Sequence, residues 1–259
     1  MMKKLLVILL LAVSQMAHAD VLGEYSFEGT LDGRIPVRIA FWVNIDSIAV
    51  GEIYYPKAKN PAPILIVGSM FDNGFFHLNE YQSDGVITGS MSLIITDENH
   101  GDGPILKEGT WTNPRTEKEL TFKRMEACAF PSELYNKYPY ADPQHIGREY
   151  SYQRWNPNYK SMMGGHVSFR GAGKYKLHFH VSNVPQNIAE GRSEPGRPAE
   201  LIPFTYNSFV YKDVNECGYG FRATFFNKFV VLQTITGWDT LHCFGSGVSF
   251  SGVYIMVKE

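Results

Sequence analysis

Residues 25–55, YSFEGTLDGRIPVRIAFWVNIDSIAVGEIYY, alternate apolar and polar side chains with a period of two. Successive side chains of an extended strand point to opposite faces, so this spacing predicts strands with one buried face and one that is wet or used for binding. We therefore expect the first strands of an antiparallel meander. The apolar side of the clearest strand carries Ile35, Val37, Ile39, Phe41 and Val43.

The same alternation continues to about residue 125. Turn residues such as Asp32-Gly33, Asp72-Asn73-Gly74 and Asp84-Gly85 separate the apolar runs. Short strands with tight links predict a closed up-and-down barrel or a strongly curled sheet, because closure removes exposed edges. Eight strands are expected, near residues 22–31, 35–44, 49–55, 64–71, 75–82, 86–96, 106–112 and 120–125.

The pattern changes after residue 126. Residues 131–158 lose the alternation, and Pro131-Ser132-Glu133-Leu134 predicts the start of a short helix. Residues 183–203 hold four prolines and no periodicity. They predict a long loop, which is either a solvated insertion or a segment that engages another protein. Six further strands are expected, near residues 166–170, 175–182, 207–211, 220–226, 229–235 and 248–257.

These patterns together predict a mainly β protein. An N-terminal antiparallel meander or barrel-like domain is expected over residues 20–126, and a second, smaller β-rich (α+β) domain over residues 127–259.

Residues 1–19 are predicted to be a secretory signal peptide. Lys3 and Lys4 precede an apolar run, and Ala17-His18-Ala19 supplies the small residues of a cleavage site, so cleavage is expected after Ala19. The apolar run of about 9 residues is far shorter than the roughly 20 that cross a bilayer. We expect a periplasmic or secreted protein without a membrane span.

Composition and charge narrow the class of partner. The formal net charge is −2, and removal of two lysines with the signal peptide changes it to −4. A weakly acidic chain lacks the basic patch that nucleic acid requires, so no nucleic-acid partner is expected. Aromatic residues make up 14% of the chain and charged residues 19%, which suits a β-rich exported protein.

The chain has three cysteines, which leaves one unpaired if a single disulfide forms in an oxidising compartment. Cys217 and Cys243 lie 26 residues apart in what we interpret as neighbouring strands, and we expect them to be paired. Closing that loop would contribute on the order of 3 kcal/mol. Cys128 is then free, buried, or paired with one of the other two.

Six short motifs in the first half carry a resemblance. They are Phe27-x-Gly-Thr, Ile35-Pro-Val, Gly51-Glu-Ile-Tyr-Tyr, Pro63-Ile-x-Ile-x-Gly, Leu78-x-Glu-Tyr and Gly109-Thr-Trp. Together they resemble a small β-meander domain widespread in secreted bacterial proteins, over residues 23–124. The motifs are mostly structural glycines and core positions, so the resemblance implies a fold in the style of lipocalin or avidin barrels and not a chemistry.

The C-terminal run Cys243-Phe-Gly-Ser-Gly-Val-Ser-Phe-Ser-Gly-Val-Tyr is similar to an element of bacterial envelope proteins, some of which are described as lysozyme inhibitors. The similarity covers residues 217–258, without the glycine that directly follows the cysteine in that family. Such inhibitors use an S-G-x-x-Y loop, whereas Ser251-Gly252-Val253-Tyr254 is one residue shorter. The resemblance therefore implies an inhibitor-like element but assigns no inhibitory residue.

Aromatic and arginine side chains are dense between residues 135 and 159, and two more arginines lie in the predicted loop. Tyr, Trp and Arg dominate protein interfaces, and flat aromatic faces also suit sugar rings. Core packing between the two domains explains the same residues equally well, so both interpretations stay open. The candidate binding residues are Tyr135, Tyr138, Tyr140, Arg148, Tyr150, Tyr152, Arg154, Trp155, Arg192 and Arg197.

The sequence contains no G-x-S-x-G, H-E-x-x-H, Walker or dinucleotide-binding motif. We therefore expect no catalytic residue, no metal and no cofactor. The favoured hypothesis is a non-enzymatic envelope protein that binds a protein partner, as a hydrolase inhibitor or a toxin-immunity protein. The alternatives are a carrier of a small apolar ligand or glycan inside the barrel, and a cell-wall hydrolase.

Overall fold

The structure is a computed structural model of the chain. It describes residues 21–97, 103–141, 148–156, 160–170, 176–184, 187–192, 199–205, 207–213, 220–235 and 251–258. The predicted signal peptide lies outside these residues. Among the described residues, no helix is long and apolar enough to cross a membrane.

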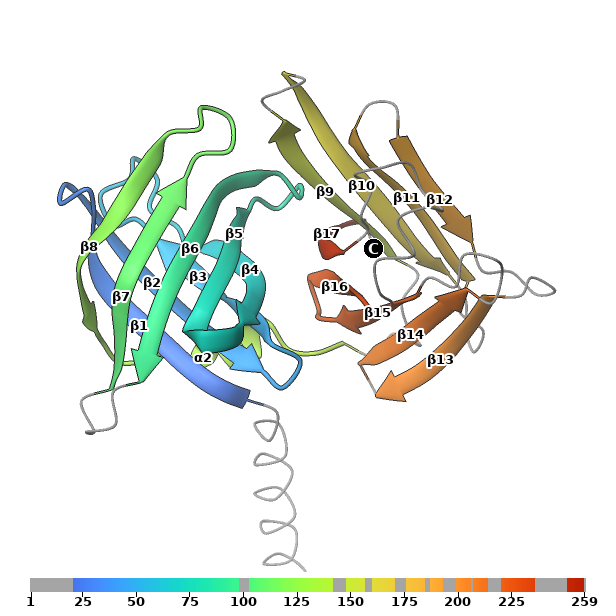
Figure 1. Cartoon of the computed structure of the whole chain (residues 1–259), viewed down its shortest axis with the longest axis horizontal. Coiled ribbons are helices and arrows are strands. Elements are labelled where there is room, and N and C mark those ends of the chain that lie inside the picture. The colour runs from blue at the N-terminus through green and yellow to red at the C-terminus, as the bar shows by residue number, and fades with distance from the viewer. Residues whose placement is uncertain are drawn as a thin grey trace, which may run out of the picture. The chain divides into compact units, whose positions relative to one another are not determined.

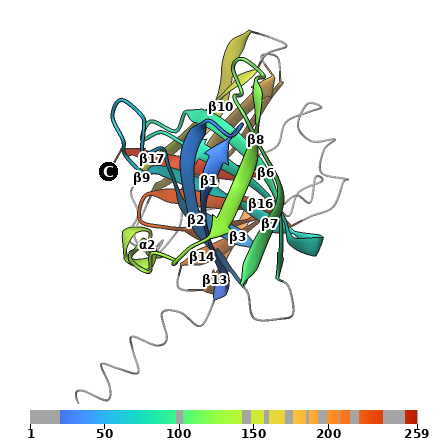
Figure 2. The ribbon, with the colours of Figure 1, turned by 90° about the vertical axis from the view of Figure 1, so that its left-hand side faces the viewer.

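The first half of the chain folds into a closed antiparallel barrel in which the strands follow one another in chain order, and β8 pairs with β1 (Figure 1). Figure 2 turns the ribbon so that β1, β2 and β8 face the viewer. The predicted barrel and its eight strands are confirmed. They are β1 (Val21–Leu31), β2 (Ile35–Asn44), β3 (Ile48–Tyr54), β4 (Ile64–Phe71), β5 (Phe75–Tyr81), β6 (Ile87–Asp97), β7 (Pro104–Thr112) and β8 (Glu119–Ala127).

Aromatic rings pack across the barrel interior. The ring centroids of Tyr25, Phe41 and Phe76 lie 5.2 to 5.3 Å apart in all three pairs. Phe76 comes from β5, which is a neighbour of neither β1 nor β2, so the three rings bridge the inside of the barrel. Gly51 on β3 pairs with Phe41 on β2, and a Cβ atom added at Gly51 would lie 2.5 Å from the Phe41 Cβ atom. An eight-stranded barrel is just wide enough to be filled by such side chains.

The apolar side predicted for β2 is largely inside. Val37, Ile39, Phe41 and Val43 are buried, whereas Ile35 is 43% exposed at the start of the strand. The predicted apolar face is therefore inside except at Ile35. The opposite face was predicted to be wet or used for binding, and this is wrong for the second half of β2, where Ala40, Trp42 and Asn44 are also buried.

The second half forms one nine-stranded antiparallel sheet. The last strand lies in the middle of this sheet, between β9 and β16, and the edge strands are β12 and β13. The short helix α2 (Glu133–Lys137) precedes the strands of this sheet in the chain, as predicted. The strands are β9 (Arg148–Asn156), β10 (Ser161–Arg170), β11 (Lys176–Val184), β12 (Asn187–Arg192), β13 (Ala199–Thr205), β14 (Ser208–Asp213), β15 (Gly220–Phe225), β16 (Phe229–Thr234) and β17 (Gly252–Lys258).

Three of these strands correct the sequence analysis. The segment predicted to lack alternation contains β9, whose tyrosines at 150 and 152 alternate with polar residues once tyrosine is counted as apolar. The segment predicted to be a long loop contains β12 and β13. Both are edge strands that pair on one side only, so β13 tolerates Pro203, which cannot donate a backbone hydrogen bond.

Cys128 directly follows β8 and has a free thiol. Its Sγ atom lies 3.1 Å from the Oγ atom of Ser26, and its backbone N–H donates to the Ser26 carbonyl oxygen at 2.9 Å. The proposed partners Cys217 and Cys243 lie outside the described residues, so their pairing remains a prediction.

Candidate binding surface at one rim of the barrel

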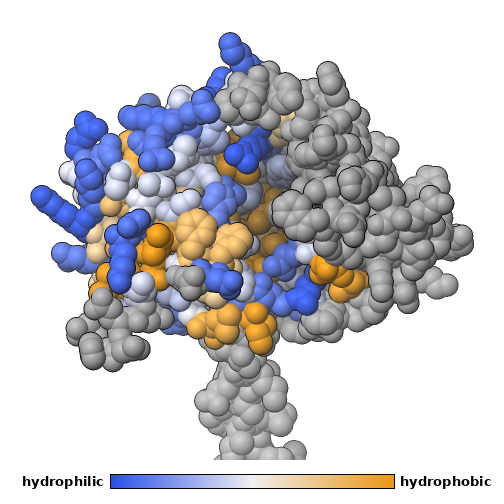
Figure 3. Space-filling view, in the orientation of Figure 1, coloured by the Kyte–Doolittle hydropathy of each residue, from blue (hydrophilic) through white to orange (hydrophobic). Residues whose placement is uncertain are grey.

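One end of the barrel exposes large apolar side chains. At this end β1 and β7 begin and the β2–β3 and β4–β5 turns lie, and Figure 3 shows hydrophobic surface where β1 begins. We call this end the apolar rim. Its members are Leu22 at 56% exposure, Ile45 at 64%, Phe71 at 53%, Phe75 at 37% and Ile105 at 37%. They leave on the order of 400 Å² of apolar surface, a size at which patches on monomers are often functional.

Leu22 lies at a β-bulge near the start of β1 and is exposed. The β1–β2 ladder pairs Val21 with Asn44 and Gly23 with Val43, which leaves Leu22 as the extra residue between them. A bulge bends the strand and re-aims a side chain. Leu22 therefore has no partner residue in the regular ladder, and it lies two residues from Glu24, which is also exposed, on the same side of β1.

Ile45 is held at the tip of a turn by the residue before it. Asn44 is 1% exposed, and its Oδ1 atom accepts hydrogen bonds from the backbone N–H groups of Asp46 at 3.0 Å and Ile48 at 2.8 Å. The Ser47 N–H donates to the Asn44 carbonyl oxygen at 2.9 Å, with Ser47 in the left-handed region at φ 59°. A buried amide thus fixes the turn while the isoleucine at its tip faces water.

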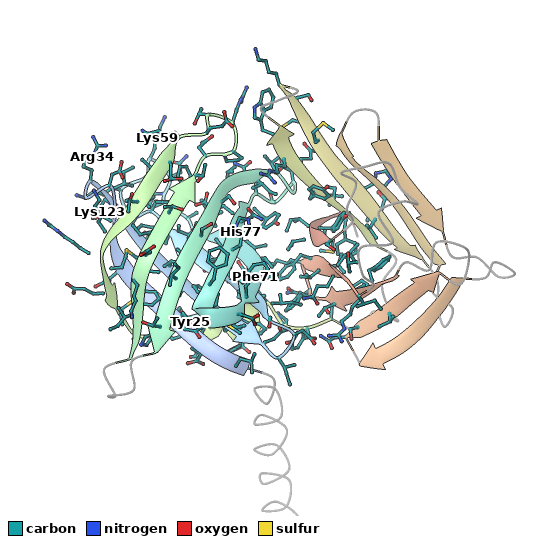
Figure 4. The ribbon with its side chains drawn as sticks, in the orientation of Figure 1. Tyr25, Arg34, Lys59, Phe71, His77 and Lys123 are labelled. Atoms are coloured by element: carbon teal, nitrogen blue, oxygen red, sulfur yellow. The ribbon has the colours of Figure 1, made fainter. Side chains whose placement is uncertain are left out.

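Phe71 and Phe75 flank the 3-10 turn η1 (Asp72–Gly74), and their ring centroids lie 5.7 Å apart. Gly74 has φ 71°, and an added Cβ would overlap the carbonyl oxygen of Ile95. This close approach requires glycine, and the tight reversal sets the two rings side by side. Figure 4 labels Phe71 on the barrel.

Backbone contacts connect the bulge of β1, the β2–β3 turn and η1. The pairing of Val21 with Asn44 brings the bulge next to the β2–β3 turn. The Met70 N–H donates to the Ser47 carbonyl oxygen at 2.8 Å, which ties that turn to the entrance of η1. The backbone segments that carry the rim residues of β1 to β5 are therefore neighbours.

The opposite end of the barrel, the charged rim, has a different character. Its turns, at residues 32–34, 55–63, 82–86 and 113–118, hold five lysines and arginines and three acids. Arg34 and Lys59, labelled in Figure 4, extend from this end. Arg34 lies 3.7 Å from Asp32 in an exposed ion pair of the kind that contributes little to stability.

A buried carboxylate lies inside the barrel. Glu80 is buried, its Oε1 atom accepts a hydrogen bond from Trp111 Nε1 at 2.7 Å, and its Oε2 atom accepts one from Thr88 Oγ1 at 3.3 Å. Glu80 and Trp111 belong to motifs noted in the sequence, Leu78-x-Glu-Tyr and Gly109-Thr-Trp. These motif residues therefore link two barrel strands. Within the described residues, no group of three or more His, Cys, Asp and Glu is placed to hold a metal.

Some of the predicted binding residues lie in the core of the second sheet. Tyr138 and Tyr150 are buried, with ring centroids 6.3 Å from those of Phe229 and Phe225 respectively. Tyr140 packs on Phe226 at 5.0 Å. These ring contacts are all made within the second half of the chain.

Tyr152 lies edge-on to Tyr254, with ring centroids 5.0 Å apart. Burial raises the pKa of Tyr152 to about 12, although nearby Arg154 opposes the shift. Burial also raises the pKa of Tyr254 well above its usual value, and Tyr152 adds to that shift. Both hydroxyls stay protonated at neutral pH.

The other predicted binding residues fall into two groups. Arg154 is exposed, and Tyr135 and Trp155 are half-buried. The side chains of Arg148 and Arg192, and all of Arg197, lie outside the described residues.

Sequence reasoning missed every member of the apolar rim. Phe-Asp-Asn-Gly-Phe and Asn-Ile-Asp-Ser each carry apolar residues beside turn residues, where alternation no longer explains them. Apolar residues placed beside turn residues were therefore the sequence signal that pointed to the rim.

No protein-family model, curated protein or solved structure matches the chain. Of the two resemblances found in the sequence, only the barrel fold is confirmed by the structure, and the rest stays a prediction.

Proposed function

We propose that this chain is a non-enzymatic binding protein of the bacterial envelope, which docks a protein partner through the apolar rim. The observation that carries the proposal is that three separate segments at one end of the barrel display apolar side chains. Leu22 stands at a bulge, Ile45 in a turn held by a buried asparagine, and the Phe71–Phe75 pair around a glycine turn. Exposed apolar side chains lower solubility, so their fixed display at one rim favours a role in contact.

The size of the rim fits the centre of an interface rather than all of it. Stable complexes bury about 800 Å² on each partner, with aromatic anchors near the middle and polar residues around them. Phe71 and Phe75 are such anchors, and the polar residues of the turns supply the border. A hydrolase inhibitor or a toxin-immunity protein needs this kind of preformed surface.

The two alternatives have less support. A carrier needs an open interior, and the rings of Tyr25, Phe41 and Phe76 occupy that space at their level of the barrel. A wall hydrolase needs convergent titratable groups, and Glu80 is instead hydrogen-bonded through both oxygens inside the barrel.

Photo-crosslinking in cells tests the proposal. A crosslinking amino acid replaces Phe71 in the full chain, and the matched control carries it at Ile35, which is 43% exposed near the charged rim. We expect a protein adduct in good yield from position 71 and none from position 35. Equal labelling from both positions, or no protein adduct from position 71, would contradict the proposed function.

The purified partner then provides the quantitative test. Phe71→Ser removes an anchor, and binding is expected to weaken by about 2 kcal/mol, or roughly 30-fold. If the partner is a hydrolase, its inhibition, measured by lysis of cell-wall substrate, is expected to fall in parallel. Ile35→Ser is the control and should leave both quantities unchanged.

A further inference from the structure

Positive charge gathers at one side of the charged rim, in a group of five side chains that we call the basic corner. Arg34 comes from the β1–β2 turn, Lys57 and Lys59 come from the loop after β3, and Lys123 and Arg124 come from β8. All five are exposed. Figure 4 labels Arg34, Lys59 and Lys123, which lie at the same end of the barrel.

Strand pairing brings the three segments together. Lys123 on β8 pairs with Thr30 on β1, one residue before that strand ends, and Arg34 lies in the turn that follows. On the other side of β2, the pair of Arg38 with Tyr54 is the last of its ladder. The chain that leaves β3 therefore passes beside the start of β2, and the three segments are neighbours around β1 and β2.

The cations of the basic corner are largely unpaired. Arg34 lies 3.7 Å from Asp32, whereas the other four take part in no ion pair within the described part of the chain. The loop at residues 55–63 holds two lysines and no acid. The other two turns of the charged rim, at residues 82–86 and 113–118, together hold two cations and two acids. Positive charge is therefore concentrated at the basic corner and is not spread evenly over the rim.

Acids border the basic corner along β1 and β8. Glu119 begins β8, and Glu28 on β1 pairs with Glu126 on β8 beyond the register shift at Gly29. Arg38 on β2 also pairs with Glu28, which gives this group a cation of its own. The five cations therefore outnumber the acids of the same region.

The net charge of the chain conceals the basic corner. The whole chain carries a formal charge of −2. Electrostatic screening acts over about 8 Å at physiological ionic strength, so a surface in contact with the corner interacts mainly with the charges nearest to it. A weakly acidic protein is therefore able to bind an anionic surface through this corner.

The exposure of the basic corner indicates what kind of anion it fits. All five cations stand on turns or on the outer wall, so they do not enclose a single phosphate group as a buried pocket would. Ile35, which directly follows Arg34, is 43% exposed. A bilayer with anionic lipids offers an array of phosphate groups above an apolar layer, whereas a linear anionic polymer offers no apolar contact to Ile35.

We infer that the basic corner rests on a bilayer surface that contains anionic phospholipid headgroups. Lysine suits this contact because its ammonium group is a hydrated point charge on a flexible stem, which pairs with phosphates without a fixed geometry. The inference does not rest on the proposed function, because the basic corner and the apolar rim lie at opposite ends of the barrel. In this arrangement the apolar rim stays turned away from the bilayer and open to a protein partner.

Co-sedimentation with vesicles tests the inference, with the full chain after removal of the predicted signal peptide. Phosphatidylcholine vesicles are compared with vesicles that also contain phosphatidylglycerol. We expect binding to the anionic vesicles to be at least about 50-fold stronger in low salt, because each cation near an anionic surface contributes a factor of about 5. The difference should shrink in high salt.

Charge variants locate the effect. Lys57→Gln with Lys59→Gln should weaken binding to the anionic vesicles roughly 20-fold. The matched control, Lys107→Gln with Lys160→Gln, removes the same charge from exposed positions outside the basic corner and should weaken binding less than about 3-fold. Equal losses for the two double variants, or equal binding to the two kinds of vesicle, would overturn the inference.

Other occupants give different results, each of which would also overturn it. Inorganic phosphate that displaces the protein from vesicles better than chloride does at equal ionic strength would indicate a site for single phosphate groups. Binding to polyphosphate or single-stranded DNA that requires Lys57 and Lys59, without binding to vesicles, would indicate an anionic polymer.

The variant Phe71→Ser separates this inference from the proposed function. It should leave vesicle binding unchanged, because Phe71 lies at the other end of the barrel. Loss of vesicle binding in this variant would place the bilayer at the apolar rim and would count against both proposals. Loss of a protein adduct from position 71, with lysine-dependent vesicle binding intact, would remove the proposed function alone.

Discussion

The two ends of the barrel close with turns of similar chemistry, yet they display different side chains. At the apolar rim the Asn44 side chain accepts two backbone N–H groups, and at the charged rim the Asn113 side chain accepts those of Arg115 at 2.9 Å and Thr116 at 3.0 Å. The first turn presents an isoleucine at its tip, whereas the second presents arginine, glutamate and lysine.

The difference lies in how deeply each turn is anchored. Asn44 is buried and Asn113 is half-buried. Gly74 packs against the Ile95 carbonyl, whereas Gly33, with the same φ of 71°, has nothing within 4 Å of an added Cβ. An apolar display in water needs a turn that resists collapse onto the barrel, and the deeper anchoring supplies that resistance. Charged side chains are solvated however deeply the turn that carries them is anchored.

The largest expected effect comes from the glycine pair. Gly74→Ala adds a steric overlap to an unfavourable φ and is expected to lower the free energy of unfolding by about 3 kcal/mol. Gly33→Ala meets only the φ penalty, about 1 kcal/mol. Urea denaturation followed by tryptophan fluorescence measures both. Equal losses would show that the two turns are anchored alike.

The asparagine pair gives the next effect. Asn44→Ala leaves two N–H groups without their acceptor in a protected turn and should cost about 2 kcal/mol. Asn113→Ala frees exposed N–H groups that water can satisfy, and about 0.5 kcal/mol is expected. The same denaturation experiment compares the two variants, and a larger loss for Asn113→Ala would contradict the burial difference.

The smallest effect on stability is expected at the displayed side chains themselves. Phe71→Ser and Ile35→Ser each alter an exposed residue, so each should change the free energy of unfolding by less than about 0.5 kcal/mol. Thermal melts of the two variants should nearly coincide with that of the parent chain. A loss above about 1.5 kcal/mol for Phe71→Ser would mean that its ring is needed for folding and is not simply displayed.

Alternation was sufficient to predict the barrel because alternate residues are buried in strands such as β5 and β6. It located Ile39 and Phe41 inside, and turn residues gave the connections. Alternation failed at β9 because tyrosine can be counted either as apolar or as polar. It failed at β12 and β13 because they are edge strands, where a proline such as Pro203 is tolerated.

The candidate surface was not predictable in the same way. Leu22 stands at a one-residue register shift, and Ile45 stands in a turn whose backbone N–H groups donate two hydrogen bonds to the Asn44 side chain. Such details depend on how strands pair and not on the period of the pattern. The cluster of tyrosines, by contrast, was visible in the sequence, but composition alone does not distinguish Tyr150 in a core from a tyrosine at an interface.

The position of β17 has a consequence for damaged copies of the gene. Because this strand bridges β9 and β16, loss of β17 would split the sheet into two four-stranded fragments, β9–β12 and β13–β16. Ile255 pairs with Ser151 across about 100 intervening residues, so a growing polypeptide is able to form this bridge only long after β9 has been synthesised.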